Sequence, residues 1–110
     1  MRVNRWVFVS VLLAAAGAQA QEKTPPGKPL FERYCAECHA AGFGHPGTQR
    51  LGLNKGPDYA VLEQRMDLSA AYVRAVVRSG LIEMPPFRPT EIADRELADL
   101  ARYLAKVRGR

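Results

Sequence analysis

Five consecutive residues, Cys35-Ala36-Glu37-Cys38-His39, constrain the fold of this chain more than any other feature. A Cys-x-x-Cys-His run is the signal for c-type haem attachment. Two thiols three positions apart on a helical turn reach two vinyl groups along one edge of a porphyrin and form thioethers. The imidazole of the next residue then lies under the ring, where a nitrogen binds iron. Because the chain contains only two cysteines and two histidines, we predict one covalent haem c on Cys35 and Cys38, with His39 as an axial iron ligand.

Three other uses of this motif fit the sequence less well. A structural zinc site needs four ligands, and His45 is the one further histidine, with no second cysteine pair. A thioredoxin-like redox motif is expected beside a βαβ pattern, and no strand pattern flanks these residues. A disulfide between Cys35 and Cys38 would close a very short loop and stabilise the fold little. Haem attachment is the interpretation that remains.

Residues 1–20 have the pattern of a cleaved signal peptide. Two arginines lie within the first five residues, residues 6–16 form a short apolar core, and Ala18-Gln19-Ala20 is a small-x-small cleavage site. An uncleaved membrane anchor is the alternative, but the apolar run is shorter than the ~18 residues needed to span a bilayer. We therefore predict a mature domain of residues 21–110, exported to a bacterial periplasm, with no membrane span after cleavage.

The mature chain is long enough for one small domain and is weakly cationic. Removing 20 leader residues from 110 leaves 90, and removing the two leader arginines leaves 14 basic against 11 acidic side chains, a net charge of +3. So short a chain buries a small core, to which a large apolar cofactor would add. Nucleic-acid binding is not indicated, because basic and aromatic residues do not alternate. The basic residues near the C-terminus indicate a solvated helix end, or alternatively a docking patch for an acidic partner: Arg102, Lys106, Arg108 and Arg110.

The first half of the mature chain is predicted to be helical at the haem motif and irregular around it. An irregular lead-in covers 21–29, and apolar residues at helical spacing run from Leu30 to the motif. Five glycines and two prolines predict a loop over 40–57. Asp58 is expected to cap a short helix over 58–65.

The second half shows clearer helix signals. Ser69 is a good N-cap for a helix that should end at Gly80. A proline-rich, non-helical segment then covers 81–89. The last helix starts near Asp94 and is marked by apolar residues at i, i+3 and i+4 spacing: Leu97, Leu100, Ala101, Leu104 and Val107. No strand pattern is present, so the predicted fold class is all-α.

A second axial ligand for iron is predicted at Met84. This residue lies in Gly80-Leu81-Ile82-Glu83-Met84-Pro85-Pro86-Phe87, after a helix stop and before two prolines. A thioether is a weak ligand, so the backbone must place it, and prolines stiffen the approach. Met66 is expected to be ordinary packing or surface. His45 could bind only if its loop crossed to the far side of the ring.

The mature chain resembles the class I cytochromes c. The family's opening pattern, Gly-x-x-x-aromatic-x-x-x-Cys-x-x-Cys-His, is matched by Gly27, Phe31 and the haem motif. The family's distal Gly-x-x-x-Met-Pro segment is similar to residues 80–87, and its closing helix to residues 97–104, with Tyr103 before the last leucine. The resemblance implies a small helical fold around one haem, in which the first and last helices cross at Phe31 and Tyr103.

The same resemblance implies a partner for the axial histidine. A proline carbonyl should accept the Nδ1–H of His39, which orients the ring and raises its basicity. Pro46 is the candidate, with Pro57 as a rival. Apart from the resemblance, the residues themselves offer Arg50 and Tyr59 as candidate hydrogen-bond donors to the haem propionates, with a side chain that faces water as the alternative for each.

The implied function is electron transfer, with the iron cycling between Fe(III) and Fe(II). More narrowly, the short chain and the Met-Pro-Pro-Phe sequence are similar to the cytochrome subunits of flavocytochromes of the p-cresol methylhydroxylase type. That similarity implies a flavoprotein dehydrogenase as electron donor and a cytochrome or oxidase as acceptor. The protein would be a free shuttle or a stable subunit.

Two other functions are weighed against electron transfer. A haem peroxidase or gas-binding protein needs an open sixth position and a distal acid–base group, but the distal segment contains a methionine and prolines. An exported binding module without haem would have to leave the motif unused. Both alternatives are therefore less favoured than an electron carrier.

Overall fold

The computed structural model describes residue 17 and residues 23–106 of the chain. The predicted signal peptide lies outside the described residues, Gly17 excepted, as does Val107 of the predicted last helix. No helix in the described part is long and apolar enough to cross a membrane.

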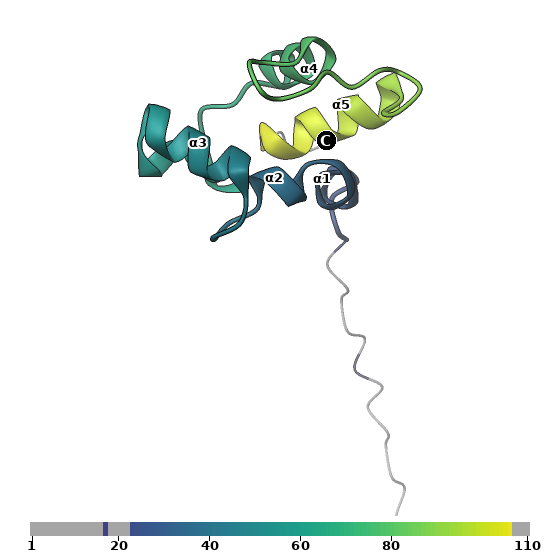
Figure 1. Cartoon of the computed structure of the whole chain (residues 1–110). Helices are drawn as coiled ribbons and strands as arrows, with labels where there is room; N and C mark the ends of the chain where they lie inside the picture. The colour runs from purple at the N-terminus through teal and green to yellow at the C-terminus, as the bar shows by residue number, and fades with distance from the viewer. Residues whose placement is uncertain (1–16, 18–22, 107–110) are drawn as a thin grey trace, which may run out of the picture.

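Helices make up the regular structure of the described residues, with no strand beyond one isolated bridge between Leu81 and Met84 (Figure 1). The all-α prediction is confirmed. The elements in chain order are α1 (Gly27–Tyr34), α2 (Ala36–His39), α3 (Pro46–Lys55), the 3₁₀ helices η1 (Pro57–Tyr59) and η2 (Leu62–Gln64), α4 (Ala70–Ser79) and α5 (Asp94–Leu104).

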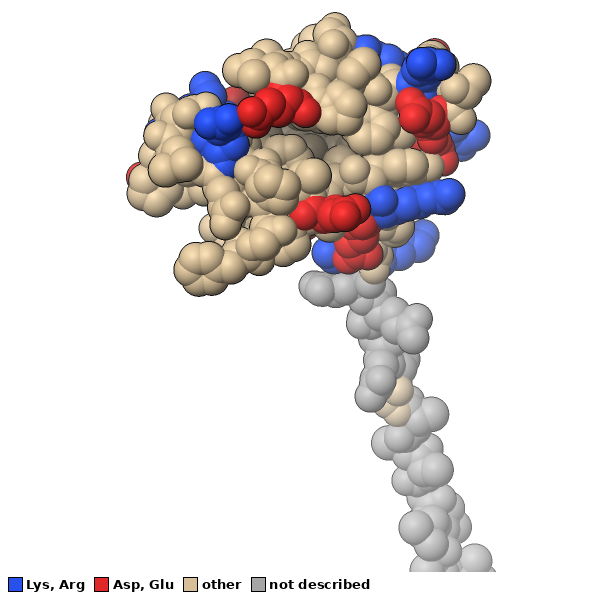
Figure 2. Space-filling model, in the orientation of Figure 1, with Lys and Arg blue, Asp and Glu red and all other residues tan. Residues whose placement is uncertain are grey.

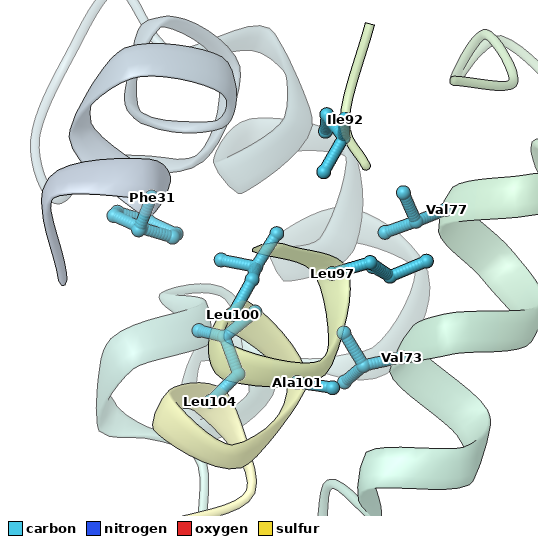
Figure 3. Close-up of a cluster of buried hydrophobic side chains, with 8 residues drawn as sticks. All are labelled: Phe31, Val73, Val77, Ile92, Leu97, Leu100, Ala101 and Leu104. Atoms are coloured by element: carbon cyan, nitrogen blue, oxygen red, sulfur yellow. The ribbon is translucent and has the colours of Figure 1, made fainter. Parts of the chain in front are cut away.

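Helix α5 lies between α1 and α4 and carries half of the buried apolar side chains (Figure 1). Its apolar stripe meets one face of each neighbour, as its i, i+3, i+4 spacing predicts. Helices α2 and α3 contribute no apolar side chain to this buried cluster. The cluster, drawn in Figure 3, consists of Phe31, Val73, Val77, Ile92, Leu97, Leu100, Ala101 and Leu104.

Helices α1 and α5 cross closely at Gly27, and the predicted aromatic contact is present there. The rings of Phe31 and Tyr103 lie 6.2 Å apart and are tilted by 59°. Gly27 is buried, and a Cβ atom on it would lie 2.4 Å from both the carbonyl oxygen of Asp99 and the Cβ of Tyr103. The conformational cost of this glycine is therefore offset by the close approach that it permits.

Helix α4 begins and ends where its capping residues predict. The hydroxyl of Ser69 accepts a hydrogen bond from the backbone N–H of Tyr72 at 3.1 Å. Gly80 ends the helix with a φ of 71°, a left-handed conformation that glycine adopts without strain. Helix α5 begins at Asp94 as expected, with the carboxylate of Glu96 accepting from the backbone N–H of Ala93 at 2.9 Å.

Replacing Ser69 by alanine is expected to lower the free energy of unfolding by about 1 kcal/mol, because the N–H of Tyr72 loses its acceptor. Guanidinium unfolding of the haem-loaded protein measures this change. Ser79→Ala at the other end of α4 is the control and should change the unfolding free energy much less. Equal values for Ser69→Ala and wild type would contradict this role for the cap.

Three predicted segments differ from the structure. Residues 46–55 of the predicted loop form α3, with Pro46 in its first turn and glycines inside it, because tertiary contacts override the weak helix signal. Residues 58–65 form two 3₁₀ turns rather than one helix, because Val61 between them is extended, and Asp58 lies inside the first turn instead of capping a helix. Helix α1 begins at Gly27, inside the predicted irregular lead-in.

Candidate haem-binding site

The two cysteines lie on one tight turn between α1 and α2. Cys35 is the residue between the helices, and its carbonyl oxygen accepts from the backbone N–H groups of Cys38 and His39 at 3.2 Å and 2.9 Å. Both thiols are free, so no disulfide is formed. Burial, and then the nearby thiol of Cys38, raises the pKa of Cys35 to about 11. The half-buried Cys35 and the exposed Cys38 thus offer two free thiols on one turn.

The imidazole of His39 is held with one edge against the start of α3. A Cβ atom on Gly47 would lie 2.6 Å from Cε1 and 2.8 Å from Nδ1 of the ring, so only a glycine fits there. Burial lowers the pKa of His39, a shift that favours the neutral imidazole, the form that binds metal. Nδ1 is buried and has no hydrogen-bond partner among the described residues. The hydrogen bond predicted from Nδ1 to the carbonyl of Pro46 is therefore not made in this structure.

Two hydrogen bonds tie the start of α3, including its N-cap residue His45, to α2 and to Ala40, the residue that follows α2. The hydroxyl of Thr48 donates to the carbonyl of Ala40 at 2.8 Å, and Nδ1 of His45 donates to the carbonyl of Glu37 at 2.7 Å. The side chain of His45 is therefore bonded to the backbone of α2, the helix that ends at His39. Sequence reasoning missed Gly47 and Thr48, for which the signal available was a proline at a helix start.

Met84 is placed by a turn of the backbone. Leu81 and Met84 exchange two backbone hydrogen bonds of 3.1 Å and 3.0 Å, and Phe87 N–H donates to the carbonyl of Val77 at 2.8 Å. A Cβ atom on Gly80 would lie 2.7 Å from the carbonyl oxygen of Met84, so glycine is required where the turn leaves α4. The side chain of Met84 is half-buried against the apolar cluster.

Met66 is 82% exposed and belongs to the surface, as expected. Among the described residues, no group of three or more His, Cys, Asp or Glu side chains could hold a metal ion.

The face of the molecule seen in Figure 2 is hollowed between the part that α4 forms and the part that α2 and α3 form. Helix α2 carries Cys38 and His39, and the chain leaves α4 into the turn that carries Met84, so the hollow is bounded by helices that lead to both groups of predicted ligands. The donor set fits haem c: two thiols on one turn, an imidazole whose edge packs against Gly47, and a thioether on a turn held by backbone hydrogen bonds. The residues present are therefore suited to hold haem c.

The two predicted propionate donors have other partners in the structure. Arg50 forms a bidentate ion pair with Glu83, with Nη2 2.7 Å from Oε1 and Nε 3.3 Å from Oε2. Tyr59 is half-exposed, and the guanidinium of Arg65 lies 5.5 Å from the centre of its ring. Arg65, which sequence reasoning missed, is 8% exposed and forms a bidentate ion pair with Asp67. The propionate roles of Arg50 and Tyr59 remain predictions.

Replacing Gly47 by alanine is expected to displace the imidazole of His39 and destabilise the haem-loaded protein by about 1–3 kcal/mol, the usual effect of overpacking. Guanidinium unfolding followed at the haem absorbance measures this. Gly52→Ala on the same helix is the matched control, because its Cβ would meet Ala60 at an acceptable 3.4 Å. The site geometry is wrong if both variants unfold at the same denaturant concentration.

A family model described as cytochrome c oxidase, cbb3-type, subunit III matches residues 22–104. The chain belongs to this family of c-type cytochromes. It is also similar to the cytochrome c subunit of 4-cresol dehydrogenase (hydroxylating) from Pseudomonas putida. The two are 34% identical over 97 residues, which cover 88% of this chain and 74% of the relative.

Two crystal structures of p-cresol methylhydroxylase contain a chain of similar fold. The structure at 2.5 Å resolution matches with a TM-score of 0.51 and 32% identity, over 72% of this chain and 89% of that chain. The structure with substrate bound matches with a TM-score of 0.52 and 30% identity, over 76% of this chain and 93% of that chain. These likenesses confirm the predicted class I cytochrome c fold.

As a c-type cytochrome, this protein carries covalently bound haem c and transfers electrons. The relative is the cytochrome c subunit of a dehydrogenase, and this match supports an electron carrier rather than a catalytic subunit. The peroxidase alternative finds no support in these matches. The prediction of an electron carrier is confirmed.

Proposed function

We propose that this cytochrome is the electron-accepting subunit of a periplasmic flavoprotein dehydrogenase that oxidises a phenolic substrate. The observation that carries the proposal is the likeness to the cytochrome c subunit of 4-cresol dehydrogenase, which extends over 88% of this chain. A periplasmic location is supported by the signal-peptide pattern of residues 1–20. From this cytochrome the electron would pass to a second cytochrome or an oxidase.

In this proposal Cys35 and Cys38 would form the two thioethers, and His39 and Met84 would be the two protein ligands of the iron. The haem supplies one-electron cycling between Fe(III) and Fe(II). A thioether ligand and burial of the ring favour the reduced state and raise the midpoint potential. Gly47 and the turn that begins at Gly80 fix the two ligands in advance, so little has to move when the charge changes.

A stable subunit is favoured over a free shuttle by the apolar surface beside Met84. Leu81 is 50% exposed and Ile82 is 89% exposed, and the two prolines after Met84 are also exposed. A lasting interface needs a larger and more apolar contact than a brief redox encounter does. The partner would cover this turn and the edge of the ring near Cys38.

Isolation of the protein from its native source at low ionic strength tests the proposal. We expect a flavin-containing subunit to co-elute with the cytochrome, and added 4-cresol to reduce the haem of the isolated complex, observed as the appearance of the sharp reduced-haem bands. Ascorbate reduction of the same sample is the control for a competent haem. A cytochrome that elutes alone, with no flavin absorbance and no reduction by 4-cresol, would contradict the partner that we propose.

A further inference from the structure

The ion pair between Arg50 and Glu83 joins two parts of the molecule that otherwise have little contact. Helix α3 packs on α2 and on η1, and not to any comparable extent on α4 or α5. Within residues 23–106, no other hydrogen bond or ion pair links α3 to the segment between α4 and α5. Figure 2 shows a basic and an acidic side chain in contact at the rim of the hollow, on the side of α3.

Each end of this ion pair lies on a segment that positions one of the two residues proposed to bind iron. Arg50 lies on α3 about one turn after Gly47, whose backbone abuts the imidazole of His39. Glu83 immediately precedes Met84 in the turn that begins at Gly80. The pair therefore connects the helix behind the histidine to the turn that carries the methionine.

The turn that carries Met84 has few other contacts at its tip. The side chain of Ile82 is 89% exposed, and its φ of 56° is an unfavourable conformation for a β-branched residue. The backbone bonds of the turn run between Leu81 and Met84 themselves and do not reach α3. The base of the turn is fixed at Gly80 and Phe87, but its exposed tip opens at low free-energy cost unless a side-chain link restrains it.

We propose that the Arg50–Glu83 ion pair is a strap that holds the turn closed and keeps Met84 on the iron. The inference rests on the proposed ligation by Met84. Arg50 and Glu83 are positioning residues, which act through the turn and do not themselves contact the iron. Both side chains are more than half exposed, at 56% and 69%. The strap therefore changes the fraction of molecules in which Met84 has left the iron by only about twofold to fivefold.

Titration of the ferric protein with imidazole tests the strap, because free imidazole binds iron only when Met84 has left. We expect Glu83→Gln and Arg50→Gln each to tighten the apparent imidazole affinity by about twofold to fivefold. The charge-reversed pair, Arg50→Glu with Glu83→Arg, should return the affinity toward the wild-type value. At an ionic strength of about 1 M, the differences among these proteins should shrink, because salt screens exposed charges.

Glu32→Gln is the matched control. Glu32 forms an ion pair of 2.9 Å with Lys28 on α1, with similar exposure, but this pair does not link the two sides of the site. Its removal should leave the imidazole affinity unchanged. Equal imidazole affinities in all variants, with the sulfur-to-iron absorption band of the wild type intact, would overturn the strap alone. A wild-type protein without that band would overturn the ligation by Met84, and the strap with it.

Discussion

A variant in which Cys35 and Cys38 are both alanine is expected to lose its covalent haem and, with it, most of its helical structure. The buried apolar cluster of the polypeptide lies among α1, α4, α5 and Ile92, while α2 and α3 bury only the side chain of Thr48. The segment around the site therefore depends on the haem for its apolar contacts. A small domain has a total stability of only about 5–15 kcal/mol, so loss of a large buried group removes a major share of it.

Far-ultraviolet circular dichroism and a haem stain of a denaturing gel measure this outcome. Glu37→Ala is the matched control, because this exposed side chain lies between the two cysteines and has no role in the thioethers. It should keep both the stain and the helical signal. A double-cysteine variant with native helical content and a cooperative unfolding transition would show that the polypeptide folds without covalent haem.

Gly27→Ala is expected to destabilise the haem-loaded protein by about 1–3 kcal/mol. The added Cβ would overlap the carbonyl oxygen of Asp99 and the Cβ of Tyr103, both at 2.4 Å, and a backbone oxygen cannot rotate away as a side chain can. The gain in helix propensity on replacing glycine, at most about 1 kcal/mol, offsets only part of this. The α1–α5 crossing would have to open, which also separates Phe31 from Tyr103.

Guanidinium unfolding at a fixed temperature measures the effect of Gly27→Ala. Gly52→Ala makes the same chemical change in α3, where the nearest atom is 3.4 Å away, and should leave the protein as stable or slightly more stable. The ultraviolet–visible spectrum of folded Gly27→Ala should stay that of the wild type, because the crossing carries no proposed ligand. If Gly27→Ala were as stable as Gly52→Ala, the close approach of the helices would be wrong.

The parts of the fold that the sequence predicts are those fixed by neighbours in the chain. Ser69 and Gly80 bound α4 because capping is a local interaction, and α5 follows from its apolar spacing. The Phe31–Tyr103 contact required a family resemblance, since the two residues come from opposite ends of the domain.

The parts that the sequence does not predict depend on contacts between distant residues. The glycines of α3 predict a loop. Position 47 is nevertheless helical, and it is occupied by a glycine because only a glycine fits against His39. The partner of Arg50 lies 33 residues away, and no local pattern identifies it. The same is true of the buried Arg65, whose contact with Tyr59 is tertiary.

The most direct test of the account is an equilibrium redox titration of Met84→Ala, with its oxidised spectrum recorded in the same experiment. Loss of the thioether should remove the weak red band of sulfur-ligated ferric haem and lower the midpoint potential by on the order of 100 mV. Met66→Ala, which changes a methionine that is 82% exposed, should alter neither quantity. If Met84→Ala keeps both the band and the wild-type potential, then Met84 is not the ligand and the account of the site is wrong.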